Sequence, residues 1–83
     1  SEEIKKSKKE NPNMIIYGFL ASADLESNRI NVRKTDDSET LTLIVPESQI
    51  QQIVKMFIGE SVEIEAKRDN EGAVVLEEIR WAA

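Results

Sequence analysis

The chain contains no cysteine and no histidine, and it has only three glycines and two prolines among 83 residues. Without cysteine, neither disulfide bonds nor thiolate metal sites can hold the fold together. Without histidine or cysteine, the usual general base near neutral pH and the usual thiolate nucleophile are both missing. We therefore expect a protein that is not an enzyme and that is stabilised by an apolar core and strand pairing.

Long apolar runs are also missing. No segment approaches the roughly 20 apolar residues that a membrane-spanning helix needs, and no apolar segment of a secretion signal follows the basic N-terminal stretch. The lack of cysteine fits a reducing compartment. We expect a cytoplasmic location and no membrane contact.

The charges are distributed unevenly. Residues 1–13 carry four Lys and three Glu, so residues 14–83 hold a formal charge of −6 within a chain of net charge −5. Because an acidic surface repels phosphate, this balance disfavours nucleic acid as a partner of the folded part.

Residues 1–13 have little to bury, because Ile4 is their only large apolar side chain. We expect a flexible charged leader or interdomain linker there. The functional alternative is a basic arm in which the four lysines contact nucleic acid or an acidic partner. Residues 14–83 are expected to form one domain, part of a larger protein.

One helix is predicted within residues 45–59. Its apolar side chains recur with the spacing of one helical face, and they are Ile50, Ile53, Val54, Phe57 and Ile58. Pro46 and Glu47 suit a first turn, and Gly59 suits the position after the helix. At about three turns the helix is marginal alone, so we expect it to plug one end of a small barrel.

Five segments have strand character, namely residues 14–21, 29–34, 40–45, 60–68 and 73–81. The first is apolar throughout, which predicts that both its faces are partly covered and that Tyr17 is half-buried. Gly18 in this strand indicates a bulge or a sharp bend. In the last strand, a bulge near Glu77 or Glu78 would return Trp81 to the core, where it would close the barrel.

The order β-β-β-α-β-β predicts an all-β fold with one helix, the five-stranded OB-like barrel. An SH3-like barrel is the main rival, but its short helical turn typically falls between the last two strands. A split β-α-β sheet would need a second helix, which the pattern does not provide.

The chain also resembles small OB-like barrels of uncharacterised bacterial proteins, in which the barrel is usually a C-terminal portion. The resemblance rests on short motifs across residues 14–80, namely Tyr17-Gly18-Phe19-Leu20, residues 24–33, Pro46-Glu47, residues 59–64, residues 69–72 and Glu77-Glu78-Ile79. It implies a fold and an accessory role within larger proteins, and it brings no catalytic residue.

OB barrels bind ligands on the outer face of their second and third strands. In this sequence the outward positions there give a candidate ligand-binding set of Arg29, Asn31, Arg33, Thr42 and Ile44. This set has no aromatic side chain, although stacking contributes about 1–3 kcal/mol per base in single-stranded nucleic acid. A protein partner or the other parts of a parent protein are therefore preferred, with Ile44 as a small apolar contact.

Two acidic groups are candidates for chemistry. Glu63 and Glu65 alternate on one strand and could form a two-carboxylate hydrolase, but alternation is what solvated strand residues show. The acidic loop at residues 36–39 could bind Ca²⁺ loosely, yet it lacks EF-hand spacing and is typical of a turn. We expect no metal site and no cofactor.

The sequence thus predicts a non-enzymatic β-barrel binding or accessory module, with its specificity left open. The alternative is a weak single-stranded nucleic-acid-binding OB domain that uses Arg29 and Arg33.

Overall fold

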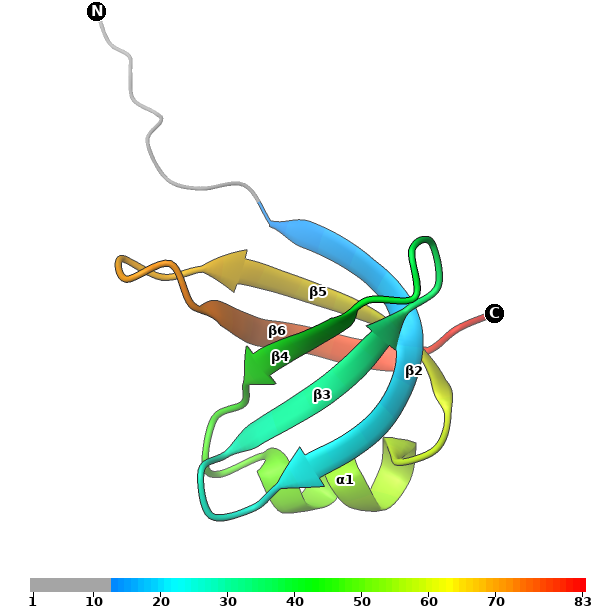
Figure 1. Ribbon diagram of the computed structural model, residues 1–83. Helices are drawn as coiled ribbons and strands as arrows, with labels where there is room; N and C mark the ends of the chain where they lie inside the picture. Colours follow the sequence, from blue (N-terminus) through cyan, green and yellow to red (C-terminus); the bar gives the residue numbers. More distant parts are fainter. Residues whose placement is uncertain (1–12) are drawn as a thin grey trace, which may run out of the picture.

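The structure, a computed structural model, describes residues 13–83. In chain order its elements are β2 (Met14–Asp24), β3 (Arg29–Lys34), β4 (Thr40–Ile44), α1 (Ile50–Phe57), β5 (Ser61–Arg68) and β6 (Val74–Trp81). The strands form one closed barrel in the order β2-β3-β4-β6-β5, and α1 lies across its lower end (Figure 1). The predicted fold class is confirmed. The leader predicted for residues 1–13 lies outside the described residues, apart from Asn13.

Closure depends on β2, which pairs with two strands. Its first half, from Met14 to Phe19, pairs with β5, and its second half, from Gly18 to Asp24, pairs with β3. The strand curves strongly where the two ladders overlap (Figure 1). A Cβ on Gly18 would lie 2.5 Å from the carbonyl oxygen of Arg33, so glycine allows the close backbone approach that this bend requires. The bulge itself falls at Ala21, which the β2–β3 register skips.

The core is the barrel interior. Alternate residues of every strand point inward, and the buried set is Ile16, Leu20, Ile30, Val32, Leu43, Val45, Ile50, Ile53, Phe57, Val62, Ile64, Ala66, Val74 and Leu76. No polar or charged residue is buried in the part that the structure describes. The fold is therefore held by apolar burial and strand ladders, as the composition requires.

The helix is shorter than predicted. Residues 45–49 form a turn in which the N–H of Gln49 donates to the carbonyl of Pro46, so Pro46 and Glu47 do not belong to the first helical turn. At the other end Gly59 has φ +79°, as expected of a residue after a helix. Three side chains of α1, Ile50, Ile53 and Phe57, are buried against the barrel, which confirms the predicted plug.

Two residues that were predicted to lie in the core, one at the end of the helix and one in the first strand, are exposed instead. Ile58 is the C-cap and has extended backbone angles, so it leaves the helical face and is exposed. Tyr17 is 53% exposed. Residues 14–20 of β2 alternate strictly, with Ile16, Gly18 and Leu20 inward, so Tyr17 points to the outer face, which is not covered.

The predicted bulge in the last strand is present. The β5–β6 register passes from Glu65↔Glu78 to Ala66↔Leu76, so Glu77 has no pairing residue in the ladder. Beyond the bulge Trp81 pairs with Val62 on the inner side, and its ring centroid lies 4.7 Å from that of Phe57. Trp81 nevertheless remains 53% exposed at the barrel end, so it contacts the core without closing it.

Replacing Phe57 by Ala should lower the free energy of unfolding by about 3–5 kcal/mol, because a buried ring that joins the helix to the barrel is lost. Urea unfolding monitored by circular dichroism measures this change. Gln52→Ala on the exposed side of the same helix should stay within about 0.5 kcal/mol of wild type. Equal stability of the two variants would contradict the role of α1 as a plug.

Replacing Gly18 by Ala should destabilise the barrel by about 1–3 kcal/mol, since the added methyl must displace the Arg33 backbone. The expected fall in Tm is about 4–8 °C per kcal/mol for a domain of this size. Thr40→Ala, at an exposed strand position, serves as the control. An unchanged Tm in Gly18→Ala would show that the two strands can move apart at no cost.

Candidate functional site

The five predicted site residues share one surface, the outer face of β3 and β4. Arg29 is opposite Ile44 in the ladder, and Asn31 is opposite Thr42. Arg33 follows at the next outward position of β3. The five residues therefore lie on one face of the sheet, as the alternation along the two strands predicted. Their side chains differ in what they contact.

Asn31 and Thr42 take part in a chain of hydrogen bonds across three strands. The amide of Asn31 donates to the hydroxyl of Ser22 on β2 at 2.9 Å, and the hydroxyl of Thr42 donates to the Asn31 carbonyl oxygen at 2.7 Å. Since these groups satisfy one another, they tie the strands together and make this part of the face polar and well ordered.

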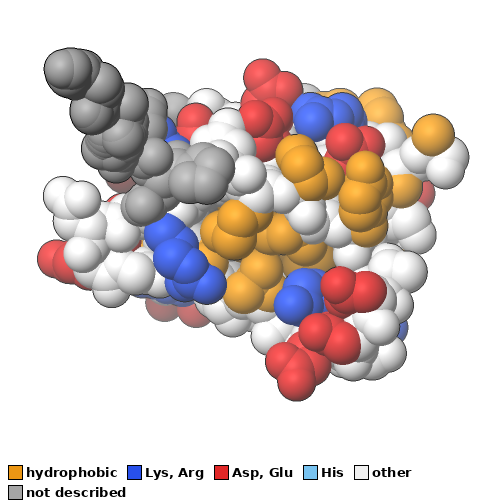
Figure 2. Space-filling model, turned by 90° about the horizontal axis from the view of Figure 1, so that it is seen from above, with side chains coloured by type: hydrophobic (Ala, Val, Ile, Leu, Met, Phe, Trp, Pro, Cys, Tyr) orange, Lys and Arg blue, Asp and Glu red, His pale blue; other side chains and the backbone are white. Residues whose placement is uncertain are grey.

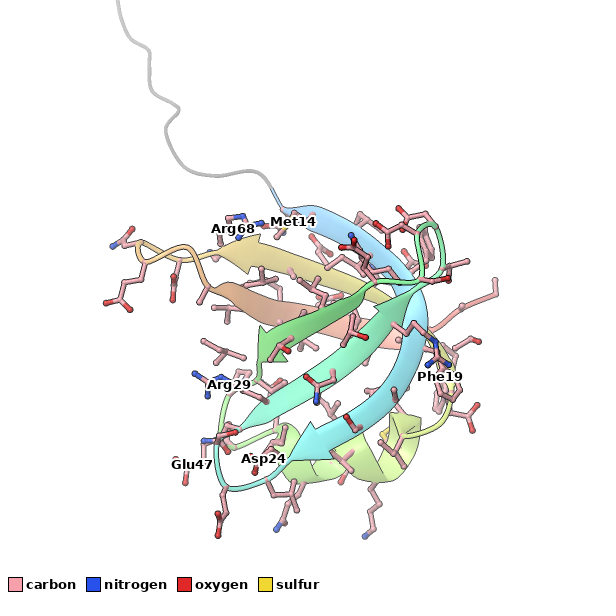
Figure 3. All side chains as sticks on the ribbon, in the orientation of Figure 1. Met14, Phe19, Asp24, Arg29, Glu47 and Arg68 are labelled. Carbon is pink, nitrogen blue, oxygen red and sulfur yellow. The ribbon has the colours of Figure 1, made fainter. Side chains whose placement is uncertain are left out.

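Arg29 lies at one end of the face, beside the turn that joins β2 to β3 (Figure 3). Its guanidinium donates to the carbonyl of Ser27. In the same turn, a hydrogen bond from the Ser27 side chain and the backbone N–H groups of Glu26 and Ser27 hold the pKa of Asp24 below its usual 3.8. Arg29 adds a smaller attraction. These contacts stabilise the turn. Because Arg29 is engaged in the turn, Arg33 is the cation of this face that is better placed to contact a ligand.

Arg33 stacks on an aromatic ring that sequence reasoning did not assign to this face. Its guanidinium carbon lies 5.3 Å from the ring centroid of Phe19, in cation–π geometry. Phe19 is the last of three exposed apolar side chains that alternate along β2, with Ile15 and Tyr17. We call Ile15, Tyr17 and Phe19 the β2 row; neighbours in the row are about 7 Å apart.

The sequence does not reveal the β2 row, because residues 14–21 are nearly all apolar. No alternation of polar and apolar residues shows which side chains point inward and which point outward. The signal that could have found it is Gly18. A glycine at a close backbone approach faces the crowded side of a bent strand, which places Tyr17 and Phe19 on the open side.

Carboxylates border the β2 row on the β5 side. Tyr17 pairs with Glu63, and Ile15 pairs with Glu65. Arg80 lies 3.5 Å from Glu63, 3.7 Å from Glu65 and 3.0 Å from Glu78. Partial burial lowers the pKa of Arg80, but the attraction of Glu63 and then Glu78 outweighs it and raises the pKa above its usual value. Glu63 and Glu65 thus share one cation on the outer face, where solvated strand residues were expected.

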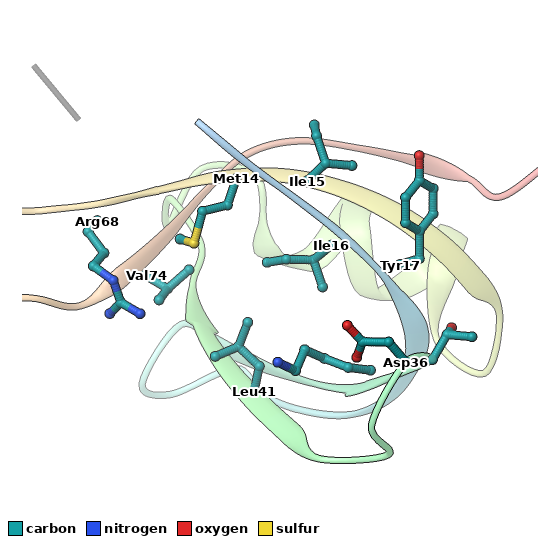
Figure 4. Close-up of a pocket in the computed structure, with 10 residues that line it drawn as sticks. Met14, Ile15, Ile16, Tyr17, Asp36, Leu41, Arg68 and Val74 are labelled. Atoms are coloured by element: carbon teal, nitrogen blue, oxygen red, sulfur yellow. The ribbon is translucent and has the colours of Figure 1, made fainter. Parts of the chain in front are cut away.

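A second feature is the barrel mouth opposite α1, where a cavity of about 570 Å³ opens. Met14, Ile16, Leu41 and Val74 point toward one another across it, whereas Ile15 and Tyr17 point away (Figure 4). Seen from above, hydrophobic side chains gather at the centre of this end with charged side chains around them (Figure 2).

Charged residues of both signs lie at the rim of the mouth. Lys34 forms an ion pair of 3.3 Å with Asp37, and Arg68 donates to the carbonyl of Gly72 at 2.8 Å. A hydrogen bond from the backbone N–H of Glu39 and the nearby Lys34 lower the pKa of Asp37. The acidic loop therefore has the turn contacts that its composition predicted.

Within residues 13–83, no group of three or more His, Cys, Asp or Glu side chains is arranged to hold a metal ion. In the same part of the chain, no helix is long and apolar enough to cross a membrane.

The fold and the outer face place the chain in the class of small OB-like barrels. No family model matches it, and a search of curated proteins finds no match. Among solved structures, it is similar to apo-CusF residues 6–88 from Escherichia coli, with a TM-score of 0.71 and 16% sequence identity over 100% of both chains. At that identity the likeness shows the fold alone.

Proposed function

We propose that the chain is a non-enzymatic binding module and that it contacts a protein partner through the β2 row and Arg33. The observation that supports this most directly is the row itself. Ile15, Tyr17 and Phe19 are 49%, 53% and 36% exposed and adjacent on one strand. Single exposed apolar residues are ordinary, but a contiguous group bordered by charge is typical of an interaction surface.

The residue types of this surface also fit protein recognition. Tyrosine, phenylalanine and arginine are enriched in protein interfaces, where the apolar centre is surrounded by a polar rim. Here the aromatic pair of Tyr17 and Phe19 has Arg33 on one side and Glu63 on the other. A matching partner would place an apolar side chain against the aromatic pair and a basic residue against Glu63.

The proposal that no reaction is catalysed rests on residue chemistry. The chain has no histidine or cysteine, and the lowered pKa values of Asp24 and Asp37 arise from local turn contacts on the surface. A catalytic acid or base is typically tuned by burial beside a charged neighbour.

The wider setting is also part of the proposal. We infer an accessory role within a larger bacterial protein of the cytoplasm, for which the support is the motif resemblance and the lack of cysteine.

Single-stranded nucleic acid remains a second candidate because of one observation. Phe19 and Tyr17 lie on the outer face beside Arg33, and aromatic rings next to cations are the usual means of holding bases and phosphates. The neighbouring carboxylates Glu63 and Glu65, and the net charge of the chain, oppose phosphate binding.

Photo-crosslinking tests the protein contact. With a benzoylphenylalanine at position 17 of the full chain, irradiation of cells should give a discrete protein adduct. The adduct should be lost when Phe19→Ser and Ile15→Ser are added, because the apolar contact is removed. The same photoreactive residue at position 51, on the exposed side of α1, is the matched control. Equal adducts from positions 17 and 51, or an adduct insensitive to the serine changes, would contradict the proposal.

Titration with labelled single-stranded DNA and RNA tests the second candidate, nucleic-acid binding, separately from the protein contact. We expect no saturation up to about 0.1 mM at moderate salt, because nonspecific binding alone is weaker than that for an acidic surface. Micromolar binding with a steep salt dependence, lost in Arg29→Ala/Arg33→Ala, would instead establish the second candidate. Loss only on deletion of residues 1–13 would move the activity to the lysine arm.

A further inference from the structure

The barrel closes least completely between β4 and β6, at what we call the open seam. β4 pairs with β3 along all five of its residues but with β6 only at Ile44↔Val75. Within residues 13–83, no strand therefore lies beside the other edge of β4 from Thr40 to Leu43. The pair lies at the C-terminal end of β4, so the rest of the strand has no ladder partner on this side.

The phase of the β3–β4 ladder shows which backbone groups face the open seam. The N–H of Val45 donates to Asn28, and the N–H of Lys34 donates to Glu39. Hydrogen-bonded pairs alternate with non-hydrogen-bonded pairs in an antiparallel ladder, and this ladder has no register shift. The N–H and C=O groups of Leu41 and Leu43 therefore point to β3, and those of Thr40 and Thr42 point away from it.

The mouth cavity adjoins this edge. Leu41 of β4 lines it on one side, and Val74 and Arg68 of the β5–β6 hairpin line it on the other. Its volume of about 570 Å³ falls within the range of ligand pockets. A strand added along Thr40 and Thr42 would place alternate side chains on the inner side of the sheet, where the cavity is.

We propose that the β4 edge and the mouth cavity together bind an extended peptide of a partner protein, by strand addition with one large apolar side chain in the cavity. Main-chain hydrogen bonds to Thr40 and Thr42 hold the peptide, and the pocket selects the side chain. The edge is suited to this, because TLTLI carries neither a charge nor a proline that would discourage pairing.

Charge complementarity narrows the peptide. The residues that line the cavity include two cations, Lys34 and Arg68, and one carboxylate, Asp36, and Asp37 at the rim pairs with Lys34. The lining itself therefore has one positive charge in excess, in a protein of charge −5. The peptide therefore carries a carboxylate next to its apolar anchor. Residues 1–12 of the chain itself contain one such pair, Glu3-Ile4, among four lysines, so their binding at this edge is an outcome of the test that would overturn the proposal.

The β4 strand of a second copy would not fill the cavity. If its β4 paired with this edge, its inward side chains Leu41 and Leu43 would remain within its own barrel. Such a pair would leave the cavity empty, so a flexible segment with no core of its own is the better occupant.

The test begins with selection of random displayed peptides on the immobilised full chain. Selected peptides are then titrated into the ¹⁵N-labelled protein and into variants. We expect enrichment of sequences with a large apolar residue beside Asp or Glu, shifts centred on the Thr40 and Thr42 amides, and slowed hydrogen exchange of Thr42 in the complex.

The decisive pair of variants is Thr42→Pro and Thr42→Val. Proline removes the N–H that faces the seam, whereas valine keeps it; both lose the hydroxyl bond to Asn31. Peptide affinity should fall about tenfold in Thr42→Pro and stay within about twofold in Thr42→Val. Val74→Phe, which fills the cavity, should also weaken binding while Tm confirms folding.

Five outcomes would overturn the proposal, and four of them come from the peptide experiments and the variants. They are no enriched peptide, peptides that shift the β2 row in place of the β4 edge, equal affinity for Thr42→Pro and wild type, and a concentration-dependent dimer that Thr42→Pro abolishes. Slow exchange of the Thr42 amide in the dilute unliganded protein would assign the edge to the chain's own residues 1–12, and it too would overturn the proposal.

Discussion

The double pairing of β2 is the constraint on which the rest of the structure depends. One strand can serve two ladders only if it bends sharply where they overlap, and this bend brings the backbone of Arg33 against Gly18. The bend fixes which β2 residues point inward. It therefore decides both that Ile16 and Leu20 join the core and that Ile15, Tyr17 and Phe19 face solvent.

The two ends of the barrel differ because, within residues 13–83, only one of them has a helix. At the lower end, the apolar face of α1 covers the core, and Phe57 extends the contact to Trp81. At the upper end, no helix of the described chain lies over the cavity that Met14, Leu41 and Val74 line. The single β4–β6 pair also leaves most of the β4 edge without a ladder partner beside this cavity.

The sequence predicted the architecture well, because strict alternation and helical spacing are local signals. Ile30 with Val32, and Val62 with Ile64, alternate with polar residues and were placed correctly. Prediction failed where the local signal has no phase or where a cap changes it. Residues 14–21 are too uniformly apolar to show that Tyr17 is outward, and only the extended C-cap geometry removes Ile58 from the helical face. The five candidate site residues were placed on one face, but the stacking of Arg33 on Phe19 depends on the β2–β3 register, which no sequence pattern shows.

The acidic border of the β2 row bears on specificity more than on stability. Exposed ion pairs such as those of Arg80 with Glu63, Glu65 and Glu78 contribute about 0–1 kcal/mol each. Three carboxylates around one guanidinium nevertheless leave a local excess of negative charge beside an apolar row. In the contact proposed above, that excess would repel acidic surfaces, other copies of this chain included, and would favour a partner whose basic groups lie next to an apolar side chain. On the other side of the row Arg33 is held by Phe19, so the aromatic ring fixes the cation that would meet an acidic group of the same partner. Carboxylates, the apolar row and a guanidinium thus follow one another across neighbouring strands. This order would fix the orientation in which a partner binds, which a row of apolar residues alone would not do.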